Sequence, residues 1–140
     1  MTSTTAAAHR KAHGTIQSVL QLCIDRLRHI DRECAQFEAE IIIESVCGCT
    51  RQQLYLDSHR TVSPLQQKSV ESILRRRARG EPLPYILKKA YFYNREYSID
   101  TSVLIPRSET EVLVDTVLKY EPNKPYTFCD MCTGSGILYA

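Results

Sequence analysis

No run of apolar residues in this sequence is long enough to cross a bilayer, because the longest purely aliphatic stretch, 41–43, is flanked by Glu40 and Glu44. A strong charge of either sign is also absent, since 18 Lys and Arg residues nearly balance 16 Asp and Glu residues. Bulk electrostatics therefore do not require a nucleic-acid partner. We expect a protein with no membrane segment and no specific nucleic-acid ligand.

Acidic residues are missing from the start of the chain, where the first is Asp25. Residues 1–14 are rich in Thr, Ala, His and basic side chains, which faintly resembles a transit peptide, although a frayed terminus is the simpler interpretation. No secretory apolar region precedes a small-residue cleavage site. We therefore expect a cytoplasmic location, where thiols stay reduced.

Six cysteines are enough to suggest a metal site. Cys23 and Cys34 fall within helical patterns and are most simply small core residues. The other four form a C-x-C at 47–49 and a C-x-x-C ending at Cys132, which together could bind zinc. Cys129, which opens the C-x-x-C, falls in an expected strand, where successive side chains point to opposite faces. We therefore predict no metal.

The basic run Arg75-Arg76-Arg77-Ala78-Arg79 is a local exception to the balanced charge. One interpretation is a solvated helix end, whose cations complement the helix dipole. The other is a contact to ribosomal RNA or to an acidic protein face. Both interpretations stay open at the level of sequence.

Residues 15–80 are predicted to form a small helical bundle, because no single helix could bury its apolar stripe alone. The first helix has one amphipathic face, made of Ile16, Val19, Leu20, Cys23, Leu27 and Ile30. The second ends at Gly48 and carries Ala35, Ala39, Ile42, Ile43 and Val46. A short third helix follows Thr50 and holds Leu54 and Leu56.

The fourth helix has the clearest boundaries. Ser63 is its N-cap, Pro64 is its first residue, and Gln66 completes a capping box. Gly80 ends this helix. Its apolar stripe consists of Val70, Ile73 and Leu74.

Beyond the fourth helix the pattern becomes extended. Pro82 and Pro84 prevent a helix from continuing and bias their neighbours to extended geometry. Aromatic and β-branched residues at 91–93 and 97–99 flank Asn94-Arg95-Glu96, which predicts a hairpin that turns at these three residues.

The last part of the chain is expected to alternate strands and helices. The apolar segment 103–106 is typical of a strand, and Ser108 with Glu111 makes a second capping box. The helix that begins there should bury Val112, Leu113, Val117 and Leu118. Residues 126–131 are predicted to form a strand, and 137–140 to start a further helix.

A glycine-rich turn, Cys132-Thr133-Gly134-Ser135-Gly136, lies between that strand and that helix. Such turns allow close backbone approach to a ligand, and a helix start presents unpaired N–H groups. No Gly-Lys-Ser or Gly-Lys-Thr follows, which excludes a Walker loop. Asp130 at the strand end repels phosphate but suits a ligand with an ammonium group, as S-adenosylmethionine has.

Four separated motifs occur in a characteristic order: Gly80-Glu81-Pro82-Leu83-Pro84-Tyr85-Ile86-Leu87, then Phe92, then Val103-Leu104-Ile105-Pro106-Arg107-Ser108-Glu109-Thr110-Glu111, then Asp130-Met131-Cys132-Thr133-Gly134-Ser135-Gly136. The series resembles the HemK/PrmC family, the protein-(glutamine-N5) methyltransferases of peptide-chain release factors. The likeness covers the chain from about residue 65 to its end. The preceding helical region matches the family in kind.

The resemblance implies an α+β fold with three parts. Residues 1–80 would form a helical substrate-recognition domain, and 81–106 a hairpin linker. Residues 107–140 would start a Rossmann-like class I methyltransferase domain, with its first strand, loop and helix. In the family, the helical domain engages the release factor, so the implied partner is a release factor, with the ribosome as a further candidate.

The resemblance also implies an activity: methyl transfer from S-adenosylmethionine to the side-chain amide nitrogen of the glutamine in a Gly-Gly-Gln loop. The implied cofactor-binding residues are Asp130, Cys132, Thr133, Gly134, Ser135 and Gly136. The implied substrate-binding residues are Leu104, Pro106 and Arg107. Leu104 would line the glutamine pocket, although it could equally be a core residue.

The sequence departs from the family in several places. It contains no Asn-Pro-Pro-Tyr, the motif that supplies the catalytic hydrogen-bond acceptors, so we assign no catalytic residue and expect the 140-residue chain to be inactive alone. Lys88 and Asn94 stand where the family commonly has Gly, and Ser108 replaces a Pro. Cys132 replaces the first Gly of the loop and would be strained by roughly 1–2 kcal/mol if its φ is positive.

Three alternatives therefore remain beside a release factor methyltransferase. A related enzyme methylates a glutamine of a ribosomal protein, and its motifs are similar. A non-catalytic module could bind a release factor or a ribosome without chemistry. A metal-binding or redox protein could use the cysteine pairs.

Overall fold

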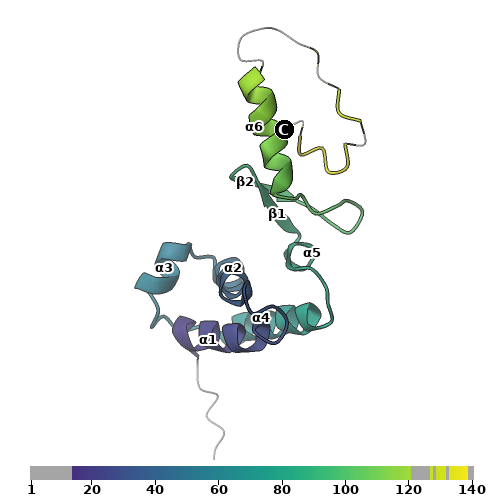
Figure 1. Cartoon of the computed structure of the whole chain (residues 1–140). Coiled ribbons are helices and arrows are strands. Elements are labelled where there is room, and N and C mark those ends of the chain that lie inside the picture. Colours follow the sequence, from purple (N-terminus) through teal and green to yellow (C-terminus); the bar gives the residue numbers. More distant parts are fainter. Residues whose placement is uncertain (1–13, 121–126, 128, 132, 139–140) are drawn as a thin grey trace, which may run out of the picture. The chain divides into compact units, whose positions relative to one another are not determined.

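The computed structural model describes residues 14–120, 127, 129–131 and 133–138, and Figure 1 shows their helices and strands. The chain divides between Arg79 and Gly80 into two compact units, each of which is described by itself. The first unit is helical. The second contains a two-stranded antiparallel sheet and two helices, so the fold is mixed α and β. Within the described residues, no helix has the length and apolar character needed to cross a membrane.

The helical unit contains four helices, and all four were predicted from the sequence. They are α1 (Ile16–Leu27), α2 (Ala35–Cys47), α3 (Arg51–Leu56) and α4 (Pro64–Ala78). The predicted capping box at Ser63 and Gln66 forms, as does another at Thr50. Gly48 ends α2 in the left-handed conformation, with φ of 62°. Local capping chemistry therefore fixes the ends of three helices.

The core of this unit is built from one face of each helix. Ile30 was predicted to belong to the face of α1, but the helix ends at Leu27, and Ile30 is 40% exposed. The apolar side chains that these helices bury are Ile16, Leu20, Cys23, Leu27, Ala35, Ala39, Ile42, Ile43, Cys47, Leu54, Val70 and Leu74. The prediction extended the helix too far, because the spacing of apolar residues does not indicate where the backbone hydrogen bonds of a helix end.

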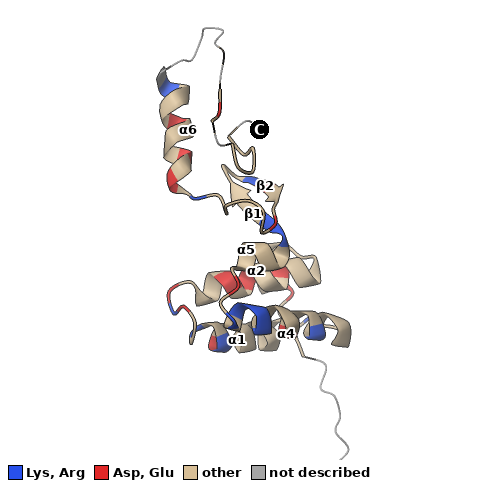
Figure 2. Ribbon diagram, turned by 90° about the vertical axis from the view of Figure 1, so that its right-hand side faces the viewer, with Lys and Arg blue, Asp and Glu red and all other residues tan. Residues whose placement is uncertain are grey.

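Two ion pairs tie helices of this unit together. Arg77 of α4 makes a two-pronged contact with Glu38 of α2, with Nε–Oε2 and Nη2–Oε1 distances of 2.9 and 3.0 Å. Glu40 of α2 is 1% exposed, lies 2.7 Å from Arg51 Nη2 and accepts a hydrogen bond from the Tyr55 hydroxyl. Part of the basic run at the end of α4 (blue in Figure 2) is thus used inside the protein.

The starts of α1 and α4 are joined by a short backbone bridge. Thr15 and Thr61 form an isolated antiparallel bridge. The Ile16 N–H donates to the Arg60 carbonyl at 2.9 Å, and the Val62 N–H donates to the Gly14 carbonyl at 2.8 Å. These bonds satisfy backbone groups that the helix starts leave unpaired.

The second unit begins with a short helix that the sequence prediction excluded. α5 (Leu83–Leu87) begins directly after Pro82, with Pro84 within its first two positions. The prediction was wrong because proline is disfavoured only in the interior of a helix. In the first turn a backbone N–H has no acceptor within the helix, so the N–H that proline lacks is not needed there. α5 ends at Lys88 in the left-handed conformation, with φ of 57°.

The predicted hairpin is confirmed, but its turn is displaced. β1 (Lys89–Phe92) pairs with β2 (Arg95–Ser98), and Phe92 faces Arg95 in the register. The turn is therefore Tyr93-Asn94 rather than the three residues from Asn94 to Glu96. Both turn residues have positive φ, 50° and 59°, as a type I′ hairpin turn requires.

The strand predicted at 103–106 is not found, because these residues pair with no other strand of the described part of the chain and lie in a loop. α6 (Glu109–Tyr120) follows as predicted, and its acidic positions are red in Figure 2. Its apolar face was predicted to be buried, yet Val112, Leu113 and Leu118 are 65%, 54% and 55% exposed. The described residues place no apolar surface over them.

The predicted strand at 126–131 does not form among the residues that can be described, namely Thr127 and 129–131. A strand is defined by its pairing, and the sheet of the described residues contains only β1 and β2. Tyr126 and Phe128 lie outside the described residues. Ile137 and Leu138 lie in a turn rather than at a helix start.

Candidate cofactor loop and substrate segment

The glycine-rich turn is closed by a backbone hydrogen bond, in which the Gly136 N–H donates to the Thr133 carbonyl at 2.9 Å. Gly134 and Gly136 have φ of 56° and 71°, a region that glycine adopts without strain. Thr133, Gly134 and Ser135 are exposed. Cys132, the first residue predicted for this loop, lies outside the described residues. The turn therefore offers accessible main chain on a conformation that needs its glycines.

Asp130 precedes this turn with an incompletely satisfied carboxylate. Its Oδ2 atom is buried and has no hydrogen-bond partner among the described residues. A buried carboxylate oxygen without a donor is unfavourable unless a ligand or a cation completes it. Asp130 thus has an acceptor available for a donor from outside the chain.

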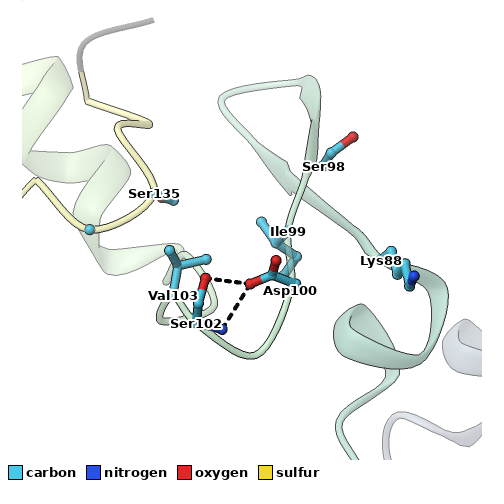
Figure 3. Close-up of a pocket in the computed structure, with 8 residues that line it drawn as sticks. Lys88, Ser98, Ile99, Asp100, Ser102, Val103 and Ser135 are labelled. Carbon is cyan, nitrogen blue, oxygen red and sulfur yellow. Dashed lines mark hydrogen bonds between the residues drawn. The ribbon is translucent and has the colours of Figure 1, made fainter.

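The turn contributes to an open hollow of about 440 Å³. Figure 3 shows Ser135 on one side and the loop that carries Asp100 and Ser102 on the other. The lining residues are Lys88, Ser98, Ile99, Asp100, Ser102, Val103, Gly134 and Ser135. Segments that are about thirty residues apart in the sequence thus line one hollow.

The loop on this side of the hollow is held by a local turn at Asp100. The Asp100 carboxylate accepts hydrogen bonds from the hydroxyl of Ser102 and from its N–H group, the latter at 2.8 Å. These bonds lower the pKa of Asp100 below its usual value, with the hydroxyl bond the larger cause and nearby Lys88 a smaller one. Asp100 therefore stays a carboxylate and keeps the loop in a fixed turn.

Lys88 lies at the base of the hairpin and also lines the hollow. Its carbonyl accepts a hydrogen bond from the Ile99 N–H at 3.2 Å, which closes the open end of the hairpin. Its left-handed backbone explains why glycine would be favourable here. Lysine at this position places a cation at the edge of the hollow.

The predicted substrate residues lie immediately after the hollow. Leu104 is 70% exposed, so it is not a core residue of this structure. Pro106 is half-buried and Arg107 is exposed. The structure therefore brings Gly134 and Ser135 together with the loop that leads into Leu104. None of the three predicted substrate residues lines the hollow itself.

Two tyrosines that were not among the predicted site residues make hydrogen bonds to the segments on either side of Leu104–Arg107. The Tyr85 hydroxyl of α5 donates to the Val103 carbonyl at 2.7 Å. Tyr93 contacts α6 through its N–H, which donates to Glu111 Oε1 at 2.7 Å, and through its hydroxyl, which donates to Asp115 Oδ1 at 2.7 Å. No sequence pattern marks such contacts. The Asp-x-Ser turn at Asp100 was readable from the sequence.

The cysteines do not form a metal site in the part of the chain that is described. No group of three or more His, Cys, Asp or Glu side chains there could hold a metal ion. Burial raises the pKa of the Cys23 thiol to about 12. Cys47 and Cys49 are also buried as free thiols.

The model of the PrmC N-terminal domain family matches residues 18–87. That span is half of the chain. The chain belongs to the HemK/PrmC family. The match runs from the first turn of α1 to the last residue of α5, so the PrmC domain includes the short helix as well as the four-helix unit.

Curated relatives extend the likeness beyond that domain. A release factor glutamine methyltransferase of Nitratidesulfovibrio vulgaris is 34% identical over 127 residues, which is 91% of this chain and 43% of the relative. Another, of Thermodesulfovibrio yellowstonii, is 39% identical over 104 residues, 72% of this chain and 37% of the relative. A bifunctional methyltransferase of Rickettsia bellii is 32% identical over 120 residues, 86% of this chain and 21% of the relative. The chain thus spans less than half the length of these PrmC-family relatives.

Proposed function

We propose that this chain contributes the release-factor recognition domain and the first cofactor loop to an S-adenosylmethionine-dependent methyl transfer. The methyl acceptor is the side-chain amide nitrogen of the glutamine in a release factor Gly-Gly-Gln loop. The observation that carries the proposal is the shared hollow, in which Gly134 and Ser135 lie opposite Ser102 and Val103. The hollow brings the cofactor loop to the residues that lead directly into the substrate segment, and the two must lie close together for the methyl group to reach its acceptor.

The residues present fit S-adenosylmethionine, which when bound supplies an electrophilic methyl group on a sulfonium. Asp130 offers its unpartnered Oδ2 to the ammonium group of the cofactor. Thr133, Gly134 and Ser135 are exposed, and Gly134 and Gly136 have the positive φ angles that close approach needs. Cys132 completes the loop in the sequence.

The substrate segment is Leu104 to Arg107. Leu104 projects an apolar side chain that is largely exposed and available to pack against the substrate. Pro106 restricts the backbone, and Arg107 presents exposed hydrogen-bond donors to the acceptor protein. An amide nitrogen is a poor nucleophile, so the work of this segment is to hold it in line with the methyl group.

The helical unit is proposed to bind the release factor. It exposes large apolar side chains away from its core, of which Phe37, Leu56 and Leu65 are 58%, 82% and 76% exposed. Exposed apolar residues are common singly, but large ones on a small unit are typical of protein contacts.

A chimera tests the proposal. The segment of the Nitratidesulfovibrio vulgaris relative that matches this chain is replaced by the chain, and methyl transfer to a release factor is measured with labelled S-adenosylmethionine. We expect transfer that is lost with Gly134→Val, because a side chain at this positive φ is strained and obstructs the loop. A folded chimera that binds the release factor without methylating it would favour the binding-module alternative.

The 140-residue chain alone is expected to bind S-adenosylmethionine weakly. Its contacts are confined to one loop, and these must overcome an association cost of roughly 4 kcal/mol or more. Titration calorimetry on the chain measures this directly. Micromolar affinity that is abolished by Gly134→Val would show that this loop is sufficient, contrary to our expectation.

A further inference from the structure

The candidate substrate segment Leu104–Arg107 lies in a loop and makes a backbone hydrogen bond at its end, where the Arg107 carbonyl accepts from the Thr110 N–H at 3.0 Å. Such a loop can orient a substrate only if its two ends are fixed, because an untethered segment samples many conformations. Among the described residues of the second unit, the side chains that connect those ends to other helices and strands are two tyrosines.

The first end is fixed by Tyr85. Its hydroxyl donates to the Val103 carbonyl at 2.7 Å, one residue before Leu104. Tyr85 belongs to α5, whose neighbours Leu83 and Ile86 are buried, so the phenol is presented from an anchored helix. The Asp100–Ser102 turn fixes the residues just before this point.

The second end is fixed by Tyr93 through α6. Glu111 and Asp115 are one helical turn apart on α6, and both accept a hydrogen bond from Tyr93, each at 2.7 Å. α6 begins at Glu109, two residues after Arg107. The apolar side chains of α6 are mostly exposed. Among the described residues, α6 is therefore connected to the hairpin mainly by these polar contacts.

The backbone of Tyr93 supports a positioning role. Its φ of 50° is a conformation that a bulky residue rarely adopts, and Asn or Gly would fit the turn better. The aromatic side chain nevertheless supplies the hydroxyl that reaches Asp115. The unfavourable backbone conformation of Tyr93 therefore accompanies a hydrogen bond to Asp115 that Asn or Gly at this position could not make.

We infer that Tyr85 and Tyr93 are positioning residues that clamp the two ends of the Leu104–Arg107 segment for the glutamine substrate. The inference rests on the proposed function for the identity of the substrate. The clamp itself rests only on the hydrogen bonds at Val103, Glu111 and Asp115.

The test compares Tyr85→Phe and Tyr93→Phe with Tyr91→Phe in the full 140-residue chain. Tyr91 is a matched control, because its hydroxyl also donates to an exposed carboxylate, that of Glu96, from the same hairpin. Backbone amide relaxation by NMR is measured at residues 104, 105 and 107. We expect the two clamp variants to lower the order of these amides and the control to leave it unchanged.

A second pair of variants separates positioning from general loss of structure. Glu111→Gln keeps an oxygen acceptor for the Tyr93 N–H, whereas Glu111→Ala removes it. The glutamine variant should keep the order of the amides at 104, 105 and 107, and the alanine variant should lower it. If all variants relax like the unmodified chain, the clamp is refuted.

Titration of the same samples with a peptide that contains Gly-Gly-Gln tests the substrate. We expect amide shifts at 104, 105 and 107, with affinity weakened roughly threefold in each clamp variant, as loss of one hydrogen bond predicts. Peptide binding that is unaffected by the clamp variants would overturn the positioning role while supporting the proposed function. Absence of any shift, with altered relaxation in the variants, would support the clamp and overturn the substrate assignment.

Discussion

α1 and α6 are both twelve residues long and both amphipathic, yet they bury very different amounts of apolar surface. In α1, Ile16, Leu20, Cys23 and Leu27 are buried in the helical unit. In α6, Val112, Leu113 and Leu118 are mostly exposed, and the contacts at Tyr93 are polar. An apolar stripe predicts a helix, but it does not say which surface covers the stripe.

The largest effect is expected from truncating a buried side chain of α1. Leu27→Ala should lower the free energy of unfolding of the helical unit by about 2–5 kcal/mol, because it leaves a cavity where the side chain is 1% exposed. Leu113→Ala on α6 should change the free energy of unfolding of the second unit by about 0.5 kcal/mol or less. Urea denaturation followed by circular dichroism measures both. Equal losses would mean that α6 is packed as firmly as α1.

Residues 15–80 are predicted to fold and to unfold cooperatively when expressed alone, because their core and helix caps lie within this segment. A helical spectrum with a cooperative melt is the expected result. A featureless spectrum would mean that the second unit is needed for the helical unit to fold.

Thiol reactivity should distinguish the buried face of α1 from an exposed position of the second unit. Burial raises the pKa of Cys23 to about 12, so near pH 8 its thiol is protonated and shielded, whereas Cys129 is exposed. We expect Cys129 to be alkylated roughly 100-fold faster than Cys23 in the native protein. Because the raised pKa belongs to the folded state, urea should remove the difference. Mass spectrometry after timed iodoacetamide treatment gives both rates.

The smallest effect concerns the left-handed Lys88. Lys88→Gly should strengthen the hairpin by about 0.5–1 kcal/mol, since relief of strain exceeds the added flexibility of the unfolded chain. Lys89→Gly in β1 is the matched control and should weaken the hairpin, because it removes the ion pair with Glu96 and places glycine in a strand. Amide hydrogen exchange of β1 and β2 reports both changes.

The sequence predicted those elements that are set by local chemistry. Ser63 and Gln66 form the expected capping box, in which the Ser63 N–H donates to Gln66 Oε1 at 2.9 Å and the Gln66 N–H donates to Ser63 Oγ at 3.2 Å. Gly48 ends α2 as expected. The same pattern at Ser108 and Glu111 gave a helix start, but the Glu111 carboxylate bonds to Tyr93 instead. A capping pattern locates a helix, whereas the partner of its carboxylate depends on what lies nearby in three dimensions.

The candidate site was predictable only in part for the same reason. Asp130 and the turn from Thr133 to Gly136 were identifiable by residue type and order. The hollow was not, because it depends on Ser102 and Val103 lying opposite a turn that is about thirty residues later in the chain. The expected strand at 126–131 also depends on a neighbouring strand, which local sequence cannot specify.

The bridge between Thr15 and Thr61 has a consequence for the order of folding. α1, α2 and α3 can meet their sequence neighbours through short loops, but this bridge closes about forty-five residues at once, and loop closure costs conformational entropy. We expect the helix contacts to form early and the bridge to form late, so that Val62→Pro, which removes the donor to the Gly14 carbonyl, would mainly speed unfolding. We therefore expect the backbone hydrogen bonds near Gly14 to lower the unfolding rate of the helical unit and to leave its folding rate almost unchanged.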